Sequence, residues 1–225
     1  MKCRTVVIGD IHGCLAHLDA LLCRVLPNPD DHLILLGDYI DRGPDSAGVL
    51  KRILQLSSRH RLALLMGNHE QMMLEARQSH DRLATWITEG GDATLRSYAG
   101  ARSTIRDIPA DHWQLLETKL ANYLESQTHI FVHAAVLPEL EITEQPDYVL
   151  KWERCDNIKP HKSGKVIVCG HTPQPNGRPM NRGYAICLDT GACAGGLLTC
   201  LEVESGRIWQ ADGRAHVSTA HISDF

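Results

Sequence analysis

The 225-residue sequence has few aromatic residues and no long hydrophobic run. Aromatic residues make up only 5% of the chain, so its core has to be built mainly from Leu, Val, Ile and Ala. The longest apolar run, near residues 61–67, is far shorter than the roughly 20 residues that a membrane-spanning helix needs. The first residues lead straight into a strand-like segment and show no signal-peptide pattern. We therefore expect a cytoplasmic protein with no membrane partner.

A surplus of basic charge is also absent. Lys and Arg number 23 against 27 Asp and Glu, which gives a formal net charge of −4. A general nucleic-acid binder normally carries a basic face, so we expect no nucleic-acid partner. The 43% hydrophobic and 22% charged residues match ordinary globular usage and exclude a disordered chain.

Eight cysteines are present, but no C-x-x-C pair and no Cys/His cluster with the spacing of structural zinc sites. Several of them lie in apolar runs, where a free cysteine behaves as a small hydrophobic residue. Without a secretory signal, we predict reduced and mostly buried thiols rather than disulfides.

Strand-like apolar runs alternate with amphipathic stretches in the first third of the chain, which predicts a parallel β-α-β-α-β unit. Residues 70–127 have a mainly helical pattern, broken at Gly90-Gly91, and the chain then returns to strands. We predict a single α/β domain over residues 1–212, with a helical insert at about 70–127 and a loosely packed polar tail at 213–225. The strands are expected at residues 5–8, 33–36, 62–66, 129–132, 166–169, 185–188, 197–203 and 207–210. The first helix is expected at 15–26, and the second is marked by apolar residues over 49–56, with Asp45 or Ser46 as its N-cap.

Five strand-like runs end in side chains of the kind that bind metal ions. In open parallel sheets, ligands bind beyond the carboxyl ends of the strands, so these five ends can converge on one crevice. The candidate metal ligands are Asp10, His12, Asp38, Asn68, His133 and His171.

This set combines carboxylates, imidazoles and one amide oxygen without any thiolate, which suits borderline-to-hard cations. Six ligands are too many for one catalytic ion that keeps an open position, but they suit two ions that share a carboxylate. Two-metal sites of this kind serve in-line displacement at phosphorus. We therefore expect two divalent metal ions, with Mn²⁺ the leading candidate in vitro and Fe or Zn as alternatives.

The same segments resemble a known family. Gly9–Gly13, Gly37–Gly43 and Gly67–Glu70 are similar to the three signature motifs of the PPP-type serine/threonine phosphatases, within the calcineurin-like metallophosphoesterase superfamily. His133 and Gly170-His171 match its two later metal histidines, and the Trp152–Arg154 segment resembles the small bacterial and phage members of the lambda phosphatase type. The resemblance, over residues 6–203, implies a mixed β-sandwich core flanked by helices, in an α/β/β/α arrangement.

Site roles follow from this resemblance, position by position. The first metal ion would be held by Asp10, His12 and Asp38, and the second by Asp38, Asn68, His133 and His171, with Asp38 bridging.

The reacting groups are also implied by the resemblance. His69 would be the general acid that protonates the leaving oxygen, and Asp41 would orient it and raise its pKa, as an imidazole beside a carboxylate does. Arg42 would clamp the phosphate, since its planar fork suits bidentate contacts to oxygen. Arg154 would be a second clamp, an assignment that rests on Trp-x-Arg alone.

The resemblance predicts a phosphomonoesterase that acts on phosphoserine and phosphothreonine in proteins, with phosphotyrosine as a further candidate, by attack of a metal-bridging hydroxide. Its partners would be phosphorylated proteins or peptides, and we expect a monomer or a weak oligomer. Two departures from the family pattern bear on this: Met66 replaces an Arg found in many members, and Ala134-Ala135 replaces the glycines of eukaryotic members. Binding of eukaryotic regulatory subunits is therefore not inferred.

Two alternatives remain open. Symmetrical dinucleoside tetraphosphate hydrolases resemble this family closely, but their motifs usually lack the Asp equivalent to Asp41 and carry Asp where Glu70 stands. The other alternative is a non-catalytic metal-binding interaction module, which would be expected to have lost a ligand or the acid; every one of these residues is present.

Overall fold

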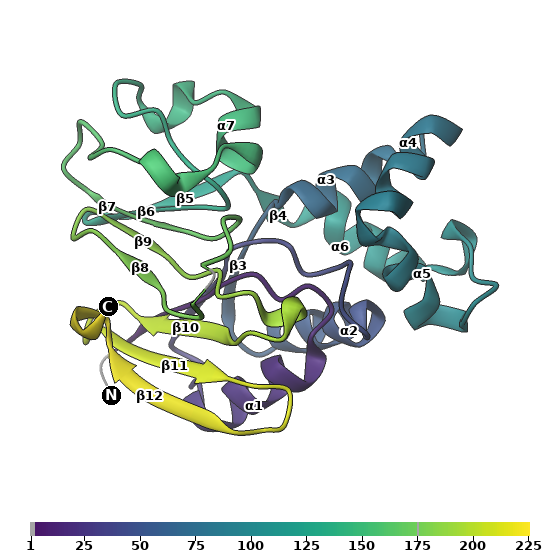
Figure 1. Ribbon diagram of the computed structural model, residues 1–225, viewed down its shortest axis with the longest axis horizontal. Helices are drawn as coiled ribbons and strands as arrows, with labels where there is room; N and C mark the ends of the chain where they lie inside the picture. Colours follow the sequence, from purple (N-terminus) through teal and green to yellow (C-terminus); the bar gives the residue numbers. More distant parts are fainter. Residues whose placement is uncertain (1–2, 175) are drawn as a thin grey trace.

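Two mixed β-sheets pack face to face in the computed structural model, which describes residues 3–174 and 176–225 (Figure 1). The space between the sheets is filled by apolar side chains such as Val7 and Ile34 from one sheet and Phe131 and Val168 from the other. Neighbouring residues in a strand point to opposite faces, so Val6 and Ile8 belong to the cluster on the other side of the first sheet. Strands buried on both faces explain why the sequence shows continuous apolar runs rather than an alternating pattern.

The first sheet has seven strands in the order β12-β11-β10-β1-β2-β3-β4. Strands β1 to β4 run parallel, and β10 pairs antiparallel with β1. Their bounds are β1 Thr5–Ile8, β2 His32–Leu35, β3 Arg61–Leu65, β4 Leu120–Ala121, β10 Leu198–Glu202, β11 Arg207–Ala211 and β12 Val217–His221.

The second sheet has five strands in the order β5-β6-β7-β9-β8. The central strands β6, β7 and β9 are parallel, and the outer two are antiparallel to their neighbours. Their bounds are β5 Tyr123–Glu125, β6 His129–Val132, β7 Val166–Cys169, β8 Met180–Asn181 and β9 Ala185–Cys187.

Helices cover the outer faces of both sheets (Figure 1). Helices α1 (Leu15–Val25) and α2 (Ser46–Ser57) bury their apolar stripes on the seven-stranded sheet. Helix α7 (Asp147–Trp152) packs on the five-stranded sheet through Val149 and Leu150. The predicted α/β/β/α layering is confirmed.

A second group of helices projects to one side of the sheets (Figure 1). It contains α3 (Asn68–Glu75), α4 (His80–Trp86), a kinked turn η1 (Ile87–Gly91), α5 (Asp92–Ala99) and α6 (Ala110–Thr118). The helical pattern therefore ends at Thr118, earlier than the predicted 127, because residues 120–125 form β4 and β5. Single 3-10 turns are η2 Ile105–Asp107, η3 Ile142–Glu144, η4 Cys155–Asn157, η5 Ala192–Ala194 and η6 Ile222–Asp224.

The polar tail is part of the first sheet, so the expectation that it packs loosely is wrong. Strand β12 pairs antiparallel with β11, with Ile208 opposite Ala220. An edge strand is held by backbone hydrogen bonds along one side, and its side chains can stay polar because they remain largely exposed. None of the helices in the described ranges has the length and hydropathy that a bilayer crossing requires.

Candidate metal centre

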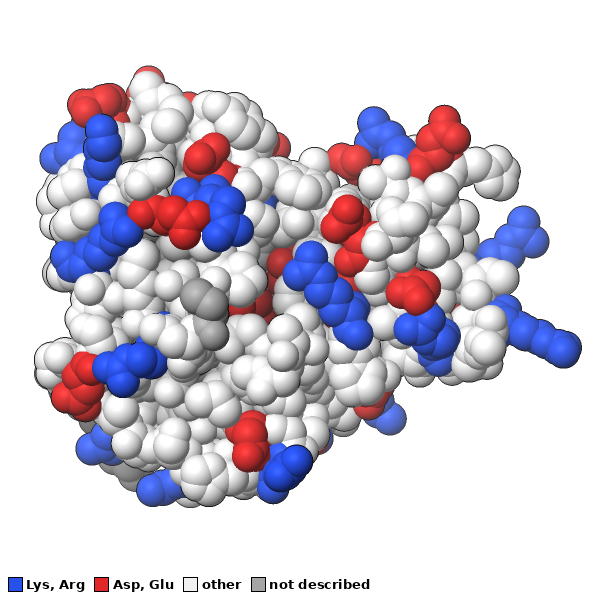
Figure 2. All heavy atoms as spheres, in the orientation of Figure 1, with Lys and Arg blue, Asp and Glu red and all other residues white. Residues whose placement is uncertain are grey.

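The carboxyl ends of β1, β2 and β3 in one sheet and of β6 and β7 in the other meet at a single rim. All six predicted metal ligands lie one to four residues beyond these ends. Five of them are no more than 5% exposed: Asp10, His12, Asp38, Asn68 and His133. Figure 2 shows the molecule hollowed near the middle of this face, with acidic atoms in the floor of the hollow and basic side chains on its flanks.

The backbone at this rim is strained. Seven non-glycine residues in the described ranges have a positive φ, and five of them lie in the predicted site: His12, Asp38, Asp41, Arg42 and His171. Such conformations cost roughly 1–3 kcal/mol each and persist where the surrounding structure imposes them, most often at functional sites. Here the turns aim side chains from separate strands toward one point.

Three histidines present a lone pair to the same small region. His12 Nδ1 lies 2.9 Å from the carbonyl oxygen of Ile40, and His133 Nδ1 lies 2.9 Å from that of Leu36. His171 Nε2 lies 3.0 Å from the carbonyl oxygen of Trp152. A carbonyl only accepts, so each of these nitrogens donates and the opposite nitrogen of each neutral ring carries a lone pair.

Burial keeps two of these rings neutral: it lowers the pKa of His12 to about 3 and that of His133 to about 4. Metal-binding histidines almost always donate their second nitrogen in this way, often to a backbone carbonyl.

Asp38 lies between two groups of ligand atoms. Its Oδ2 is 3.4 Å from His12 Nε2, and its Oδ1 is 3.4 Å from His133 Nε2. One group contains His12, Asp38 and His69, and the other contains Asp38, His133 and His171; within each, the ligand atoms lie within 4.8 Å of one another. Burial alone would raise the pKa of Asp38, but the surrounding histidines outweigh it and lower that pKa. Asp38 therefore has the position of a ligand shared by two ions.

One buried carboxylate oxygen in the cluster lacks a hydrogen-bond partner, and an amide lies beside two of the imidazoles. Asp10 Oδ2 accepts the His171 amide at 2.8 Å, but the buried Asp10 Oδ1 has no hydrogen-bond partner. The Asn68 amide lies 3.1 Å from both His133 Nε2 and His171 Nδ1, the lone-pair sides of those rings; with its nitrogen turned inward it donates to them, and with its oxygen turned inward it offers a ligand atom. A cation would stabilise the unpartnered Asp10 oxygen together with these imidazole lone pairs, so the donor set fits divalent metal ions.

His69 and Asp41 form a buried pair at the edge of this cluster. His69 Nδ1 donates to Asp41 Oδ2 at 2.7 Å, and the His69 ring packs edge-on against His12 with 4.7 Å between centroids. Burial would lower the pKa of His69, but the carboxylates of Asp38 and Asp41 raise it above its ordinary value. The second ring nitrogen of His69 is thus held in a form that can donate a proton.

Asp41 is itself fixed by two side chains from the helical region. Trp86 Nε1 donates to Asp41 Oδ2 at 2.8 Å, and Thr94 Oγ1 donates to Oδ1 at 2.6 Å. Sequence reasoning did not assign a role to either residue. The available signal was the Gly90-Gly91 break between them: a side chain on Gly91 would collide with the Trp86 ring, and Gly90 accepts a hydrogen bond from the Arg42 amide.

Glu70 closes the turn after β2. Its carboxylate accepts the amides of Asp38 and Tyr39 at 2.8 Å and that of Gly67 at 3.1 Å. Burial and the nearby Asp38 raise the pKa of Glu70 to about 8. The three bonds tie the segment that carries Asp38 to the start of α3, which carries Asn68 and His69, so Glu70 positions ligands from two strands.

The two predicted phosphate clamps differ in their surroundings. Arg42 is exposed, and its Nη1 donates to His12 Nε2 at 3.2 Å, at the mouth of the cluster. Arg154 lies on the exposed segment after α7, where its Nε pairs with Asp156 Oδ2 at 2.6 Å. The structure therefore brings Arg42 to the cluster, whereas the guanidinium of Arg154 forms an ion pair with Asp156.

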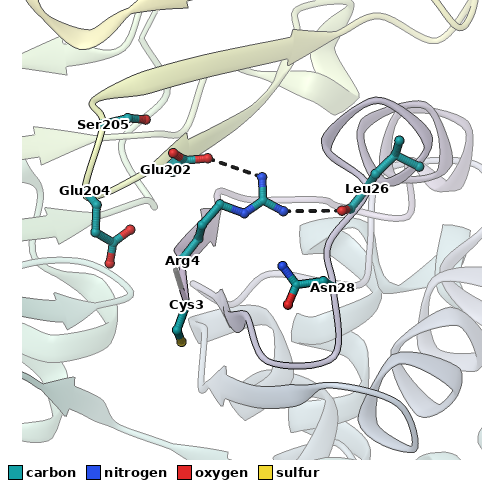
Figure 3. Close-up of a pocket in the computed structure, with 7 residues that line it drawn as sticks. All are labelled: Cys3, Arg4, Leu26, Asn28, Glu202, Glu204 and Ser205. Carbon is teal, nitrogen blue, oxygen red and sulfur yellow. Dashed lines mark hydrogen bonds and ion pairs between the residues drawn. The ribbon is translucent and has the colours of Figure 1, made fainter. Parts of the chain in front are cut away.

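A cavity of about 740 Å³ lies elsewhere, at the amino end of β1 (Figure 3). Arg4 faces it and contacts Glu202 and the carbonyl of Leu26, each at 3.3 Å. The residues around this cavity include none of the predicted ligands, so its size carries no argument about the metal centre.

Comparisons with known proteins show which proteins the chain is similar to. The family model for calcineurin-like phosphoesterases matches residues 3–185. Serine/threonine-protein phosphatase 1 of Salmonella typhimurium is 32% identical over 218 residues, which cover 88% of this chain and 91% of that protein. The asymmetrical bis(5'-nucleosyl)-tetraphosphatase PrpE of Oceanobacillus iheyensis is 28% identical over 97% of this chain and 96% of its own length. The solved structure of a cold-active protein tyrosine phosphatase superposes with a TM-score of 0.64 at 21% identity, over 99% of this chain and 80% of that one.

Proposed function

The chain belongs to the calcineurin-like phosphoesterase family, and from that premise we propose that it is a dinuclear metal-dependent phosphatase of phosphorylated proteins. Its substrates would be phosphoserine and phosphothreonine residues in proteins or peptides, with phosphotyrosine as a further substrate. The relative from Salmonella typhimurium supports the serine/threonine assignment, since it is a serine/threonine-protein phosphatase that matches most of both chains.

One observation carries the catalytic part of this proposal: the 2.7 Å hydrogen bond between His69 and Asp41 beside a buried cluster of lone pairs. A module that only binds metal ions does not require a protonated imidazole beside the metal ligands. Displacement at phosphorus requires one, because the departing alkoxide needs a proton.

The residues present fit two divalent cations that share Asp38. Asp10, His12 and Asp38 would hold one ion, and Asp38, Asn68, His133 and His171 the other. When bound, the ions supply Lewis-acid stabilisation of the phosphoryl oxygens and lower the pKa of water into the neutral range. Mn²⁺ is our choice for reconstitution because carboxylate, amide and imidazole ligands suit it.

His69 supplies the acid step. A water molecule that gives up one proton to solvent forms the new bond to phosphorus through its oxygen, in line with the breaking bond to the serine or threonine oxygen. The proton on His69 passes to that departing oxygen, so the products are inorganic phosphate and the free hydroxyl side chain. His69 regains a proton from solvent after the step. Asp41 holds the ring through Nδ1 and stabilises its charged form, while Trp86 and Thr94 prevent Asp41 from turning away.

Arg42 would bind the phosphoryl oxygens. Its exposed guanidinium stands at the mouth of the cluster and can rotate, and its planar donor fork matches two oxygens at once. Arg154 would have to exchange its ion pair with Asp156 for the phosphate to act as a second clamp.

A substrate comparison tests the proposal. One Mn²⁺-reconstituted preparation is offered phosphoserine, phosphothreonine and phosphotyrosine peptides and diadenosine tetraphosphate, and kcat/KM is measured for each. We expect the serine and threonine phosphopeptides to be hydrolysed fastest. Faster consumption of the dinucleotide would overturn the assignment, and no turnover of any phosphoester by a metal-loaded preparation would return the chain to the binding-module alternative.

Dinucleoside tetraphosphate hydrolysis is the second candidate function. The relative from Oceanobacillus iheyensis favours it, since that tetraphosphatase matches nearly the whole length of both chains. Product analysis distinguishes the two cleavage modes: symmetrical cleavage yields two ADP, and asymmetrical cleavage yields ATP and AMP. The presence of Asp41 and Glu70 supports the phosphoprotein assignment over the symmetrical enzymes.

A further inference from the structure

Three cysteines that are far apart in the sequence meet in the structure. Cys155, Cys169 and Cys187 are each 0% exposed, and their sulfur atoms lie within 4.8 Å of one another. Cys169 and Cys187 end the neighbouring parallel strands β7 and β9 and are register partners. Cys155 comes from the separate turn η4, so three independent segments converge on one point.

The surroundings of these sulfurs are distinct from those of the histidine and carboxylate cluster. All three cysteines belong to the apolar cluster between the five-stranded sheet and α7. No His, Asp or Glu ligand atom joins them in the part of the chain that the structure describes. Soft thiolates without oxygen or nitrogen ligands select soft cations, whereas the ligands of the candidate metal centre favour harder ones.

The upper bound on the sulfur separations leaves room for a three-coordinate ion. A metal–sulfur bond of about 2.3 Å places the sulfurs of a planar three-sulfur site about 4.0 Å apart. A separation of about 4.0 Å is consistent with the three sulfurs of this protein, which all lie within 4.8 Å of one another. Structural zinc almost always takes four ligands. Thiolates also select Cu⁺, which takes fewer ligands, so the three sulfurs favour the monovalent ion.

We propose that Cys155, Cys169 and Cys187 form a second metal site that binds one soft monovalent cation such as Cu⁺ in three-sulfur coordination. The thiols release protons as the sulfurs bind. Because the sulfurs are buried, the ion enters as the chain folds or through local opening of η4.

Such a site would tie together segments that carry the candidate metal centre. Cys155 directly follows Arg154, and Cys169 precedes His171 by two residues. The Cys155 amide donates to Thr172 Oγ1 at 3.0 Å, and the Cys187 thiol donates to the Gly170 carbonyl at 3.3 Å. A bound cation would thus link η4 to the loop that positions His171.

Competition for Cu⁺ tests the proposal. Reduced protein loaded with Mn²⁺ is titrated anaerobically with Cu⁺ against a chromophoric Cu⁺ chelator, both as the native protein and after refolding with the ion. We expect about one tightly held equivalent in at least one of these preparations, and X-ray absorption at the copper edge should give three sulfurs at about 2.3 Å. No uptake in either preparation, or nitrogen and oxygen neighbours around copper, would overturn the site.

Two matched alanine variants localise the ion. Cys169→Ala should weaken Cu⁺ binding by more than the roughly 100-fold that loss of an outer partner costs a metal site. Cys200→Ala should leave it unchanged, because Cys200 is equally buried in strand β10 but lies in a different cluster. Equal affinity in the two variants would assign the copper to other thiols and refute the proposal.

Two further arms keep the test decisive. Cys155→Ser, which keeps the size of the side chain on the η4 turn, should show the same loss if Cys169→Ala does not fold, as judged by circular dichroism and Tm. Zn²⁺ replaces Cu⁺ in a parallel titration, and retention of Zn²⁺ in preference to Cu⁺ would refute the choice of cation.

Discussion

Buried carboxylates lie near both ends of strand β1, but in the described ranges only the one at the amino end is compensated by a basic side chain of the chain itself. At the amino end, Asp31 is fully buried, and the chain supplies its cation: Arg4 Nη2 lies 2.6 Å from Asp31 Oδ2 and Arg4 Nε 3.1 Å from it. The amides of Arg4 and Asn28 donate to the same carboxylate. At the carboxyl end, Asp10 and Asp38 are also buried, yet neither forms a salt bridge with Lys or Arg among the described residues.

This contrast separates a structural ion pair from a binding site. A buried carboxylate is costly unless a positive charge and hydrogen bonds compensate it. The amino end of β1 has its compensating charge within the chain, so its contribution to stability at neutral pH needs no metal ion. The buried carboxylates at the carboxyl end of β1 have no such ion pair with Lys or Arg among the described residues. The stability of the protein and its activity should therefore depend on metal ions from solution.

Removal of divalent metal should have the largest effect. We expect chelation of the Mn²⁺-loaded protein to abolish phosphoester hydrolysis and to lower its Tm, with both restored by Mn²⁺. An ion present at 100 times its Kd stabilises the folded state by about 2.7 kcal/mol. Calorimetry with and without chelator measures the shift in Tm. An equal Tm in the two conditions would contradict the inference that the carboxyl end of β1 depends on metal ions.

His69→Asn separates chemistry from metal binding at the carboxyl end. Loss of a general acid lowers kcat by about 10²–10⁴-fold, while the two metal ions should remain bound. Steady-state kinetics and metal analysis on the same sample check both statements. His80→Asn is the control, since His80 is exposed at the start of α4. Wild-type kcat in the His69 variant would remove the acid assignment.

Asp31→Asn tests the amino end. The loss of a hydrogen-bonded charge at this position should lower the free energy of unfolding by about 1.5–3 kcal/mol, with kcat unchanged in the folded enzyme. Denaturant unfolding measures the loss, and Asp30→Asn, at an exposed neighbouring carboxylate, should show none of it.

The same pair predicts a pH dependence. Burial would raise the pKa of Asp31, but its hydrogen bonds with Arg4 and Asn28 outweigh burial and lower it. A group whose pKa is lowered on folding contributes its full stability above its unfolded pKa of about 3.9 and loses it as the pH falls through the folded value. The difference in stability between wild type and Asp31→Asn should therefore shrink in acid; a constant difference would mean that the charge plays no part.

Asp10→Asn should have the smallest effect on the free energy of unfolding, and the sign of this effect should be opposite to that of Asp31→Asn. Burial, with the nearby Asp189 and Asp38, raises the pKa of Asp10 well above its ordinary value. The ionised form is therefore disfavoured by folding, so at neutral pH the metal-free Asn variant should be more stable than wild type, by about 1 kcal/mol on the scale of an unsatisfied buried polar group. With Mn²⁺ the order should reverse. Unfolding in chelator and in Mn²⁺ distinguishes these outcomes, and destabilisation in both would refute them.

Much of the fold was predictable because its signals are local. The strands expected at residues 5–8, 129–132 and 166–169 match β1, β6 and β7 residue for residue, and that expected at 33–36 is displaced by one residue from β2. Both faces of these strands are buried, so each appears as an unbroken apolar run that ends where the turn begins. Strand β12 escaped prediction because an exposed edge strand carries no such pattern.

The sequence by itself determined the candidate ligands, because each one lies within four residues of the end of its strand and parallel strands end at the same rim. Only the tertiary structure decided which side chains support them. Trp86 and Thr94 reach Asp41 from 45 and 53 residues away. Cys155, Cys169 and Cys187 are 14 and 18 positions apart in sequence, a spacing that indicates no metal site. These contacts depend on how a helix or a strand packs against a distant segment, and local residue patterns do not encode that packing.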